Sequence, residues 1–387
     1  MRSADDVRVL MIDSETTWRG GQNQLALLVR GLSATGRSPG RFDTTLAAPP
    51  GSKMAAKAAE LGIRCLPLPI RSGIDLTAAR RLAQYLKRQR FDIVHCHSSH
   101  AHSIAFMAVR ALRFGRRSTP LLVVSRRVDF PVARNGLSAL KYRYGADVFL
   151  AISNGVRDAL VQCGIEPERI EIVPSGIDLE RHDRLQDTSY LEHEFGLGAG
   201  TTVIGNIAAL APHKSQVDFV RAAKIVDQEL DGVRFLIVGE GKLRGQLESL
   251  IRELDMQGKI RLTGFRDDAL EILSRLDCFV LSSHLEGLCT SIMDAQVLGI
   301  PVVATNTGGV PDLVRDGETG LLVPPREPER LAGAILRILR EPGLKERCSL
   351  AARAQARAYD YRHMVRRTIA AYRRILGRTG TTAPPAR

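Results

Sequence analysis

Short, wholly apolar runs alternate with helix-like stretches along this chain, and that alternation limits the possible folds more than any other feature. Val7–Ile12 and Thr44–Ala48 are typical of the apolar runs, and Gln22–Leu32 is typical of the amphipathic stretches. Strands without a polar face are found in parallel sheets that helices cover on both sides. The alternation breaks over Pro174–Gly200, which is rich in glycine and charge, and restarts at Val203–Ile207. The sequence therefore predicts two α/β domains in succession, each with a Rossmann-like parallel sheet.

The position of the break sets the expected domain limits. We expect a first domain over residues 1–180 and a second over residues 181–352. Residues 353–387 hold a further helix and a tail of Gly, Thr and Pro. A chain of 387 residues has the length of two ordinary domains.

Composition excludes several classes of protein. With 44% hydrophobic and 25% charged residues, the chain resembles an average globular protein and not a disordered one. No run approaches the roughly 18 uncharged apolar residues of a membrane helix, and the N-terminus lacks the apolar core of a signal peptide. The six cysteines include no Cys-x-x-Cys pair, which favours reduced thiols over a zinc site or disulfides. We expect a soluble, cytoplasmic protein.

The net charge of +13 is unevenly distributed. Residues 1–190 carry +10, residues 191–352 carry −5 and residues 353–387 carry +8. A basic face indicates an anionic partner, such as an anionic membrane or a phosphorylated glycolipid. Nucleic acid is disfavoured, since no nucleic-acid motif occurs and only 5% of residues are aromatic. A solvated basic surface is the alternative. The candidate contacts to an acceptor or a membrane are Arg110, Arg113, Arg116, Arg117, Arg126 and Arg127.

The most informative loop follows the apolar run Cys278–Leu281, because ligands of open α/β sheets bind beyond the carboxyl ends of strands. Glu286 lies in this loop, and a helix is expected to start at Cys289 or Thr290. The free N–H groups of a helix start suit a diphosphate. Asp294 lies about one turn into the helix, so two carboxylates flank the anion site and could hold hydroxyl groups. The alternative is that both carboxylates are solvated.

Three other segments also follow predicted strands. Lys214 would supply a positive charge for a phosphate, although most lysines are simply solvated. Gly20 and Gly21 would let backbone N–H groups approach a ligand closely, or would only make a flexible loop. Gly239 to Gly245 is a weak near-match to a dinucleotide fingerprint, since its third glycine comes one residue late.

A histidine cluster follows the run Asp92–His95. Residues 95, 97, 100 and 102 are all histidines. Zinc is not the favoured explanation, because no complementary cysteine or carboxylate cluster accompanies them. A histidine such as His97, at a strand end, suits polar recognition of a substrate.

With these motifs in place, the chain resembles the family 4 glycosyltransferases, which have the GT-B fold. The resemblance covers nearly the whole length. The family's Glu-x7-Glu signature appears as Glu286 to Asp294. The other matching segments are Val173–Asp178, Phe235–Gly241, Gly299–Thr305, Thr307–Asp312 and Gly317–Pro324.

The resemblance implies an enzyme that moves a sugar from a UDP- or GDP-linked donor to a glycan or glycolipid, with retention at the anomeric carbon. The first domain would hold the acceptor and the second the nucleotide-sugar, and the C-terminal helix would cross back onto the first domain. His97 and Glu286 would contact the donor sugar, Asp294 the ribose and Lys214 the diphosphate. The catalytic set is then His97, Lys214 and Glu286. The remaining donor-binding residues would be Gly20, Gly21, Phe265, Arg266, Leu288, Cys289, Thr290, Ser291 and Asp294, with the nucleobase near Phe265 and Arg266.

Two departures from the family pattern stand out. The second acid is Asp294, one methylene shorter than the commoner Glu, and Ala208 and Ala209 stand where the family usually has an Arg before the Lys. No Asp-x-Asp occurs, so we expect no metal cofactor and transfer that is independent of metal. The resemblance points to bacterial cell-surface polysaccharide or lipopolysaccharide synthesis. Peripheral attachment to the inner face of the cytoplasmic membrane is a further expectation. The alternatives are a non-catalytic sugar-nucleotide-binding protein and, with less support, a nicotinamide oxidoreductase.

Overall fold

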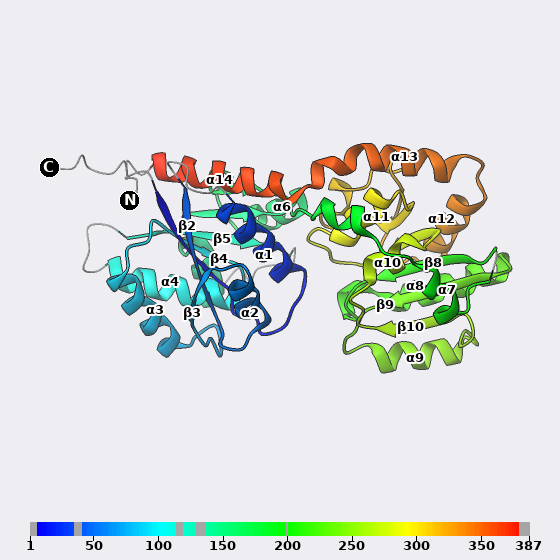
Figure 1. The fold of residues 1–387 in the computed structure, drawn as a ribbon, viewed down its shortest axis with the longest axis horizontal. Coiled ribbons are helices and arrows are strands. Elements are labelled where there is room, and N and C mark those ends of the chain that lie inside the picture. Colours follow the sequence, from blue (N-terminus) through cyan, green and yellow to red (C-terminus); the bar gives the residue numbers. More distant parts are fainter. Residues whose placement is uncertain (1–5, 35–40, 114–118, 129–135, 199, 379–387) are drawn as a thin grey trace. The chain divides into compact units, whose positions relative to one another are not determined.

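The computed structural model describes residues 6–34, 41–113, 119–128, 136–198 and 200–378, and it forms two compact units (Figure 1). The first unit comprises residues 1–176 and 361–387, and the second comprises residues 177–360. The chain therefore passes between the units twice, at Gly176–Ile177 and at Asp360–Tyr361. Within the described ranges, every helix is too short or too polar to cross a bilayer.

In the described part of the first unit, the strands form one parallel sheet in the order β3-β2-β1-β4-β5-β6-β7. Leu10 of β1 lies opposite Thr45 on one side and Val94 on the other. The strands are β1 (Val7–Ile12), β2 (Phe42–Ala48), β3 (Arg64–Pro67), β4 (Ile93–Cys96), β5 (Leu121–Arg126), β6 (Val148–Ala151) and β7 (Ile170–Ile172).

Helices cover both faces of this sheet. Successive side chains of a strand point to opposite faces, and in these strands the side chains on both faces are apolar and buried. Val9 and Met11 pack toward α1, α2 and α14, whereas Leu10 and Ile12 face the opposite side and are equally buried. Figure 1 shows α3 beside α4. The helices are α1 (Gly20–Ser33), α2 (Lys53–Glu60), α3 (Leu76–Arg88), α4 (Ser99–Arg113), α5 (Gly136–Tyr144), α6 (Asn154–Gln162) and α14 (Tyr361–Arg378).

The C-terminal helix α14 belongs to the first unit although it comes last in sequence, as the family resemblance implied (Figure 1). Its Tyr372 is fully buried in the core that α1 and α2 share with the sheet. Arg30 of α1 donates from Nε to the Tyr361 hydroxyl at 3.1 Å. The contact between α1 and α14 is close at Gly31, where an added Cβ would lie 2.4 Å from a methyl carbon of Val365.

In the described part of the second unit, the strands also form one parallel sheet, in the order β10-β9-β8-β11-β12-β13. Ile204, Phe235 and Val280 face a core shared with α8, α9, α12 and α13. The strands are β8 (Thr202–Ile207), β9 (Val233–Val238), β10 (Ile260–Gly264), β11 (Cys278–Leu281), β12 (Val302–Thr305) and β13 (Leu321–Val323). The helices are α7 (Ser189–Phe195), α8 (Gln216–Glu229), α9 (Arg244–Glu253), α10 (Ala269–Ser274), α11 (Thr290–Leu298), α12 (Pro328–Arg340) and α13 (Leu344–Ala356).

Five short 3₁₀ helices complete the described elements. They are η1 (Pro167–Arg169), η2 (Leu179–Arg184), η3 (Pro212–Lys214), η4 (Val310–Asp312) and η5 (Arg357–Tyr359). The prediction of two parallel α/β domains is confirmed, and most predicted elements lie within two residues of the observed ones. Among the described helices and strands, three escaped prediction: α5, the three-residue edge strand β13, and α7, which lies in the segment that was expected to be a linker. In addition, Gly20 and Gly21 open helix α1 and do not lie in the loop before it.

Candidate functional site

In each sheet the strand order reverses at one strand, and ligands of open α/β sheets bind beside such a reversal point. In the first unit, β1 lies between β2 and β4, and in the second unit β8 lies between β9 and β11. Gly20 and Gly21 follow β1, and His97 follows β4. Lys214 follows β8, and Glu286 follows β11. These five predicted residues therefore lie at the reversal points of the two sheets.

In the second unit, the loops after β8 and β11 are joined by hydrogen bonds. The Ser282 hydroxyl donates to the backbone oxygen of Lys214 at 2.9 Å. The N–H of His284 donates to the backbone oxygen of His213, also at 2.9 Å. Ser215 Oγ and His284 Nδ1 are 2.7 Å apart. These contacts fix the two loops, and with them their charged side chains, relative to each other.

Lys214 and Glu286 form an ion pair at the junction of these loops. The Lys214 ammonium donates to Oε2 of Glu286, and the Ser283 hydroxyl donates to the same oxygen at 3.2 Å. The Glu286 side chain is 9% exposed, and that of Lys214 is 16% exposed. The N–H of Gly309 holds the Glu286 backbone oxygen at 3.0 Å. A carboxylate this buried requires a charged partner, and an incoming phosphate would compete for the same ammonium.

Helix α11 begins beside this pair, with Thr290 as its first residue. The Ser291 hydroxyl donates to the backbone oxygen of Ile207 at 3.3 Å, so the helix start lies against the end of β8. Among the described residues no side chain caps this helix, and its first turn holds no acidic residue, which suits an anion. Leu288 and Cys289 precede the helix and are buried. Burial, with the Glu286 charge adding to it, raises the pKa of the Cys289 thiol to about 12, so this cysteine is not a nucleophile at neutral pH.

Asp294 has a partner that sequence reasoning missed. His182, in η2, lies with Nε2 3.1 Å from Oδ1 of Asp294. The His182 side chain is 5% exposed and that of Asp294 is 28% exposed. No motif marked His182, because the two residues are far apart in sequence.

The predicted nucleobase residues follow β10. Phe265 is 58% exposed, and an exposed aromatic residue suits stacking with a base. Arg266 donates to Glu194 at 2.9 Å and to Asp268 at 2.7 Å. These hydrogen bonds raise the pKa of Arg266 and lower that of Asp268 to about 2. The Arg266 guanidinium is therefore already engaged by two carboxylates.

The near-match to a dinucleotide fingerprint has a packing explanation. A Cβ added at Gly239, whose φ is +139°, would lie 2.1 Å from the Ala208 backbone oxygen. A Cβ added at Gly241 would lie 2.2 Å from the Leu210 backbone oxygen. Only glycine at both positions lets the loop after β9 press against the loop that carries Lys214.

In the first unit, a buried polar cluster lies beyond β1, β4 and β5. Asp13 follows β1 and is fully buried, and the Gln22 amide donates to both of its carboxylate oxygens at 3.3 Å. Burial raises the pKa of Asp13 to about 6, although the Gln22 hydrogen bond opposes this. Arg127 follows β5 and donates to Nδ1 of His97 at 3.4 Å. Sequence reasoning missed Asp13 and Gln22. The available signal was a carboxylate directly after an apolar strand.

Two other histidines of the cluster are structural. His95 contacts the Tyr372 hydroxyl at 2.6 Å through Nδ1 and the Ser125 hydroxyl at 2.8 Å through Nε2. His102 donates from Nε2 to a backbone carbonyl at 3.0 Å. Burial lowers the pKa of both to about 3. His100 is exposed. In the described part of the chain, no three His, Cys, Asp or Glu side chains gather as a metal site requires.

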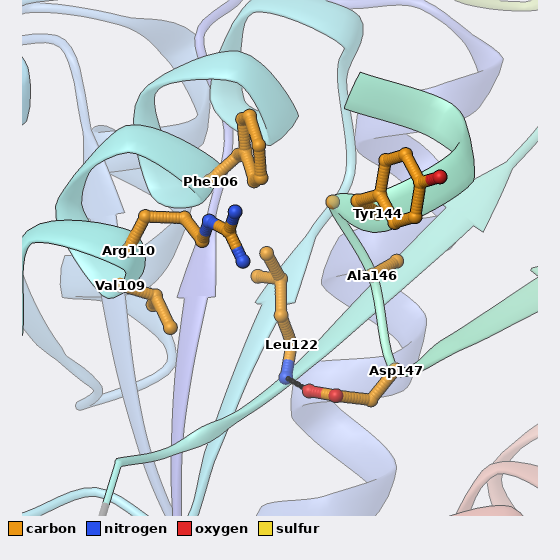
Figure 2. Close-up of a pocket in the computed structure, with 8 residues that line it drawn as sticks. Phe106, Val109, Arg110, Leu122, Tyr144, Ala146 and Asp147 are labelled. Carbon is orange, nitrogen blue, oxygen red and sulfur yellow. Dashed lines mark hydrogen bonds between the residues drawn. The ribbon is translucent and has the colours of Figure 1, made fainter. Parts of the chain in front are cut away.

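The basic residues predicted to contact an acceptor or a membrane do not form one cluster. Figure 2 shows Arg110 with Phe106 and Val109 on α4, facing Tyr144 and Asp147 across a surface pocket. The Arg110 guanidinium carbon is 5.7 Å from the centre of the Phe106 ring. This pocket lies at the start of β5, where the Leu122 N–H donates to Asp147 at 2.7 Å.

Arg126 and Arg127 lie at the other end of β5, about 17 Å along the strand at roughly 3.3 Å per residue. Arg126 donates to the Tyr142 hydroxyl at 2.7 Å, and Arg127 joins the Asp13 and His97 cluster. Arg113 ends α4, and its side chain lies outside the described part of the chain. Arg116 and Arg117 also lie outside the described residues.

Comparisons with known proteins identify the family of this chain. A family model described as Glycosyltransferase Family 4 matches residues 18–181, and one described as Glycosyl transferases group 1 matches residues 192–355. The UDP-Gal:alpha-D-GlcNAc-diphosphoundecaprenol alpha-1,3-galactosyltransferase of Escherichia coli is 27% identical over 68% of this chain and 70% of its own. The N-acetyl-alpha-D-glucosaminyl L-malate synthase of Bacillus anthracis is 25% identical over 74% of each.

The crystal structure of Anabaena HepE in complex with UDP-glucose has a TM-score of 0.80 to this chain, with 20% identity, and the match covers 95% of this chain and all of that one. The two family models follow one another along the chain and together span most of its length. The chain is thus an enzyme that belongs to the family 4 glycosyltransferases and has their GT-B fold.

Proposed function

We propose that this enzyme transfers a hexose from a UDP- or GDP-linked donor to a glycan or glycolipid acceptor, with retention of anomeric configuration. The observation that carries the proposal is the second-unit site, where the Lys214–Glu286 pair adjoins the uncapped start of α11. An ammonium and helix N–H groups suit a diphosphate, and a buried carboxylate beside them suits sugar hydroxyls. A relative named for UDP-Gal and a structural neighbour in complex with UDP-glucose support the donor class.

In the proposed mechanism, stabilisation of the departing diphosphate lowers most of the barrier. The transition state would be oxocarbenium-like, with negative charge growing on the leaving phosphate. Lys214 and the start of α11 would stabilise that charge, and Glu286, released from Lys214, would hold the donor sugar. Asp294 would hold the ribose. The acceptor would attack on the face that the phosphate leaves, and the phosphate would take the acceptor proton.

We also propose that the first unit docks on an anionic membrane surface, where a glycolipid acceptor of cell-surface polysaccharide or lipopolysaccharide synthesis would reside. Helix α3 supports this proposal, since it holds no acidic residue. Arg80, Arg81 and Lys87 are exposed along it. Ile74 and Leu76, at its N-terminal end, are each 72% exposed. Exposed apolar side chains beside basic ones are typical of peripheral membrane contacts.

The test is a donor screen with the purified full chain. UDP- and GDP-linked sugars are ranked by the rise that they cause in melting temperature, because a ligand that binds the folded state stabilises it. The best donor is then assayed with lipid-linked glycans, and NMR reports the anomeric configuration of the product. An inverted product would contradict the retaining mechanism. Loss of activity in EDTA that Mg²⁺ or Mn²⁺ restores would contradict metal-independent transfer.

A further inference from the structure

The hydrogen bonds of the polar cluster in the first unit determine which ring nitrogen of His97 carries the proton, and the family assignment does not specify this. We propose that Arg127 is a positioning residue that fixes the tautomer of His97, so that His97 presents Nε2–H as a hydrogen-bond donor. The group that accepts this hydrogen bond would be a sugar oxygen of the nucleotide-sugar. That identification rests on the proposed function.

The first step in the argument is the hydrogen bond between the two side chains. Arg127 NH2 lies 3.4 Å from Nδ1 of His97. A guanidinium has five N–H donors and no acceptor, so Nδ1 must be the accepting, unprotonated nitrogen. A neutral imidazole carries one proton, and that proton is therefore on Nε2.

The second step concerns the protonation state of the pair. Burial lowers the pKa of His97 well below its usual value, and the neighbouring His95 and Arg127 lower it further. Burial lowers the pKa of Arg127 only to about 10, so at neutral pH the arginine is charged and the histidine is neutral. The arrangement thus holds a neutral imidazole beside a cation.

The third step is the free end of the imidazole. The Nε2 atom of His97 is buried and has no hydrogen-bond partner among the described residues. The His97 residue is 6% exposed, and its own N–H donates to the backbone oxygen of Ile12 at 2.9 Å. A buried donor without a partner costs free energy, which an oxygen of a bound ligand would recover.

The remaining members of the cluster hold Arg127 in place. The Asp13 carboxylate is fully buried and acts on Arg127 through its charge. The Gln22 amide donates to both oxygens of Asp13 at 3.3 Å, and so orients the carboxylate. Gln22 thus orients Asp13, Asp13 acts on Arg127, and Arg127 donates to Nδ1 of His97. With Nδ1 accepting and Nε2 protonated, His97 is a hydrogen-bond donor to a ligand and not a general base.

Ring-nitrogen NMR of the full chain, labelled with ¹⁵N-histidine, tests the tautomer without any activity assay. His97→Asn identifies the His97 signals by their loss. In the wild type at neutral pH, we expect Nε2 to be protonated and Nδ1 to be bare. In Arg127→Met, we expect a mixture of tautomers, and in Arg127→Lys, which keeps a donor, we expect the wild-type tautomer. A protonated Nδ1 in the wild type, or an unchanged tautomer in Arg127→Met, would overturn the proposal.

Kinetics with the donor found in the screen supply the second readout. Arg127→Met should lower kcat/KM about 10- to 100-fold, as loss of a group that orients a functional histidine does elsewhere, and Arg127→Lys should recover most of it. Arg64→Met, an exposed arginine on β3, is the matched control and should behave as wild type. Lost activity in Arg127→Met with an unchanged tautomer would mean that Arg127 contacts substrate directly, and would overturn the proposal. If the screen finds no donor, the proposed function fails while the NMR result still decides the tautomer.

Discussion

At the scale of single residues, the proposed site predicts the effect of three substitutions, two in the Lys214–Glu286 ion pair of the second unit and one at His97 of the first unit. Lys214→Ala, Glu286→Ala and His97→Ala should each lower kcat/KM by about 10²–10³, if each contact strengthens in the transition state. The fold should persist, because all three side chains follow strands and lie outside the apolar cores. Lys214→Ala should still lower the free energy of unfolding, since it removes the ammonium that pairs with the buried Glu286 carboxylate. Steady-state kinetics with circular dichroism check this.

Lys242→Ala is the matched control, since this exposed lysine also follows a strand of the second unit. It should retain wild-type turnover. Wild-type turnover in all three site variants would show that the site lies elsewhere.

Asp13 should make the stability of the first unit depend on pH. Its pKa rises from 3.8 to about 6 on folding, so between these values the folded chain holds a proton that the unfolded chain has lost. The free energy of unfolding therefore falls as pH rises through this window, by at most about 3 kcal/mol. Relative to Asp13→Asn, the wild type should lose stability between pH 4 and pH 7, as measured by chemical denaturation.

Asp75 provides a contrast of opposite sign. Backbone N–H groups of Ala78 and Arg71 lower its pKa, so its contribution is present at neutral pH and is lost as pH falls. The stability difference between wild type and Asp75→Asn should therefore grow with rising pH. Parallel slopes for the two variants would contradict the assignment for Asp13.

How far single residues could be predicted depended on whether their partners lie near them in sequence. Lys214, Glu286 and Asp294 were proposed from the sequence because each stands at a fixed offset from a strand or a helix start. His182 and the link from Arg127 to His97 were not found, because these contacts join separate elements and no spacing rule connects them. Arg127 was placed on a basic face, whereas it lies in a buried polar cluster.

At the scale of elements, the hydrophobic pattern predicted the strands that are apolar throughout. The runs Val7–Ile12 and Cys278–Leu281 were predicted with their observed limits. Helix α5 (Gly136–Tyr144) was missed because its sequence, GLSALKYRY, lacks an apolar stripe, and β13 was missed because a three-residue edge strand leaves no pattern.

The contact between α1 and α14 depends on a glycine. Gly31→Ala gains up to about 1 kcal/mol of helix propensity, but its Cβ would meet Val365 at 2.4 Å. We expect a net loss of about 1–3 kcal/mol as α14 is pushed away from α1. Gly333→Ala on the exposed side of α12, where nothing lies within 4 Å of the added Cβ, should instead stabilise the protein. Chemical denaturation measures the free energy of unfolding of both variants. Equal stabilisation by Gly31→Ala and Gly333→Ala would contradict the packing argument.

At the scale of the whole molecule, the order of the two domains was predictable from the sequence, but the discontinuity of the first unit was not predictable from periodicity. Helix α14 joins the first unit through contacts with α1, more than 300 residues earlier in the chain. Gln24 marks where the chain leaves this unit, since its side chain accepts from the Gly176 N–H at 2.9 Å and donates to the Gly176 oxygen at 2.7 Å. Only the family resemblance implied that the last helix returns.

The division into units also separates the charge. The first unit has 33 basic and 14 acidic residues, a net charge of +19, and the second has 22 basic and 28 acidic residues, a net charge of −6. Long-range attraction to an anionic surface should therefore act on the first unit. The exposed side chains of α3 are the part of that unit that pairs basic groups with apolar ones.

The proposed membrane contact should be seen in co-sedimentation with vesicles. We expect the wild type to bind vesicles that contain anionic lipid at low salt, to bind neutral vesicles weakly and to lose binding as salt screens the charges. Arg80→Glu, Arg81→Glu and Lys87→Glu combined should weaken binding on the order of 100-fold, at about 1 kcal/mol for each basic residue near the surface. Lys242→Glu, Arg330→Glu and Arg347→Glu in the second unit make the same change in net charge and should leave binding nearly intact. Equal loss in both triple variants would mean that net charge, and not α3, governs binding, and equally weak binding to both kinds of vesicle would contradict the membrane contact altogether.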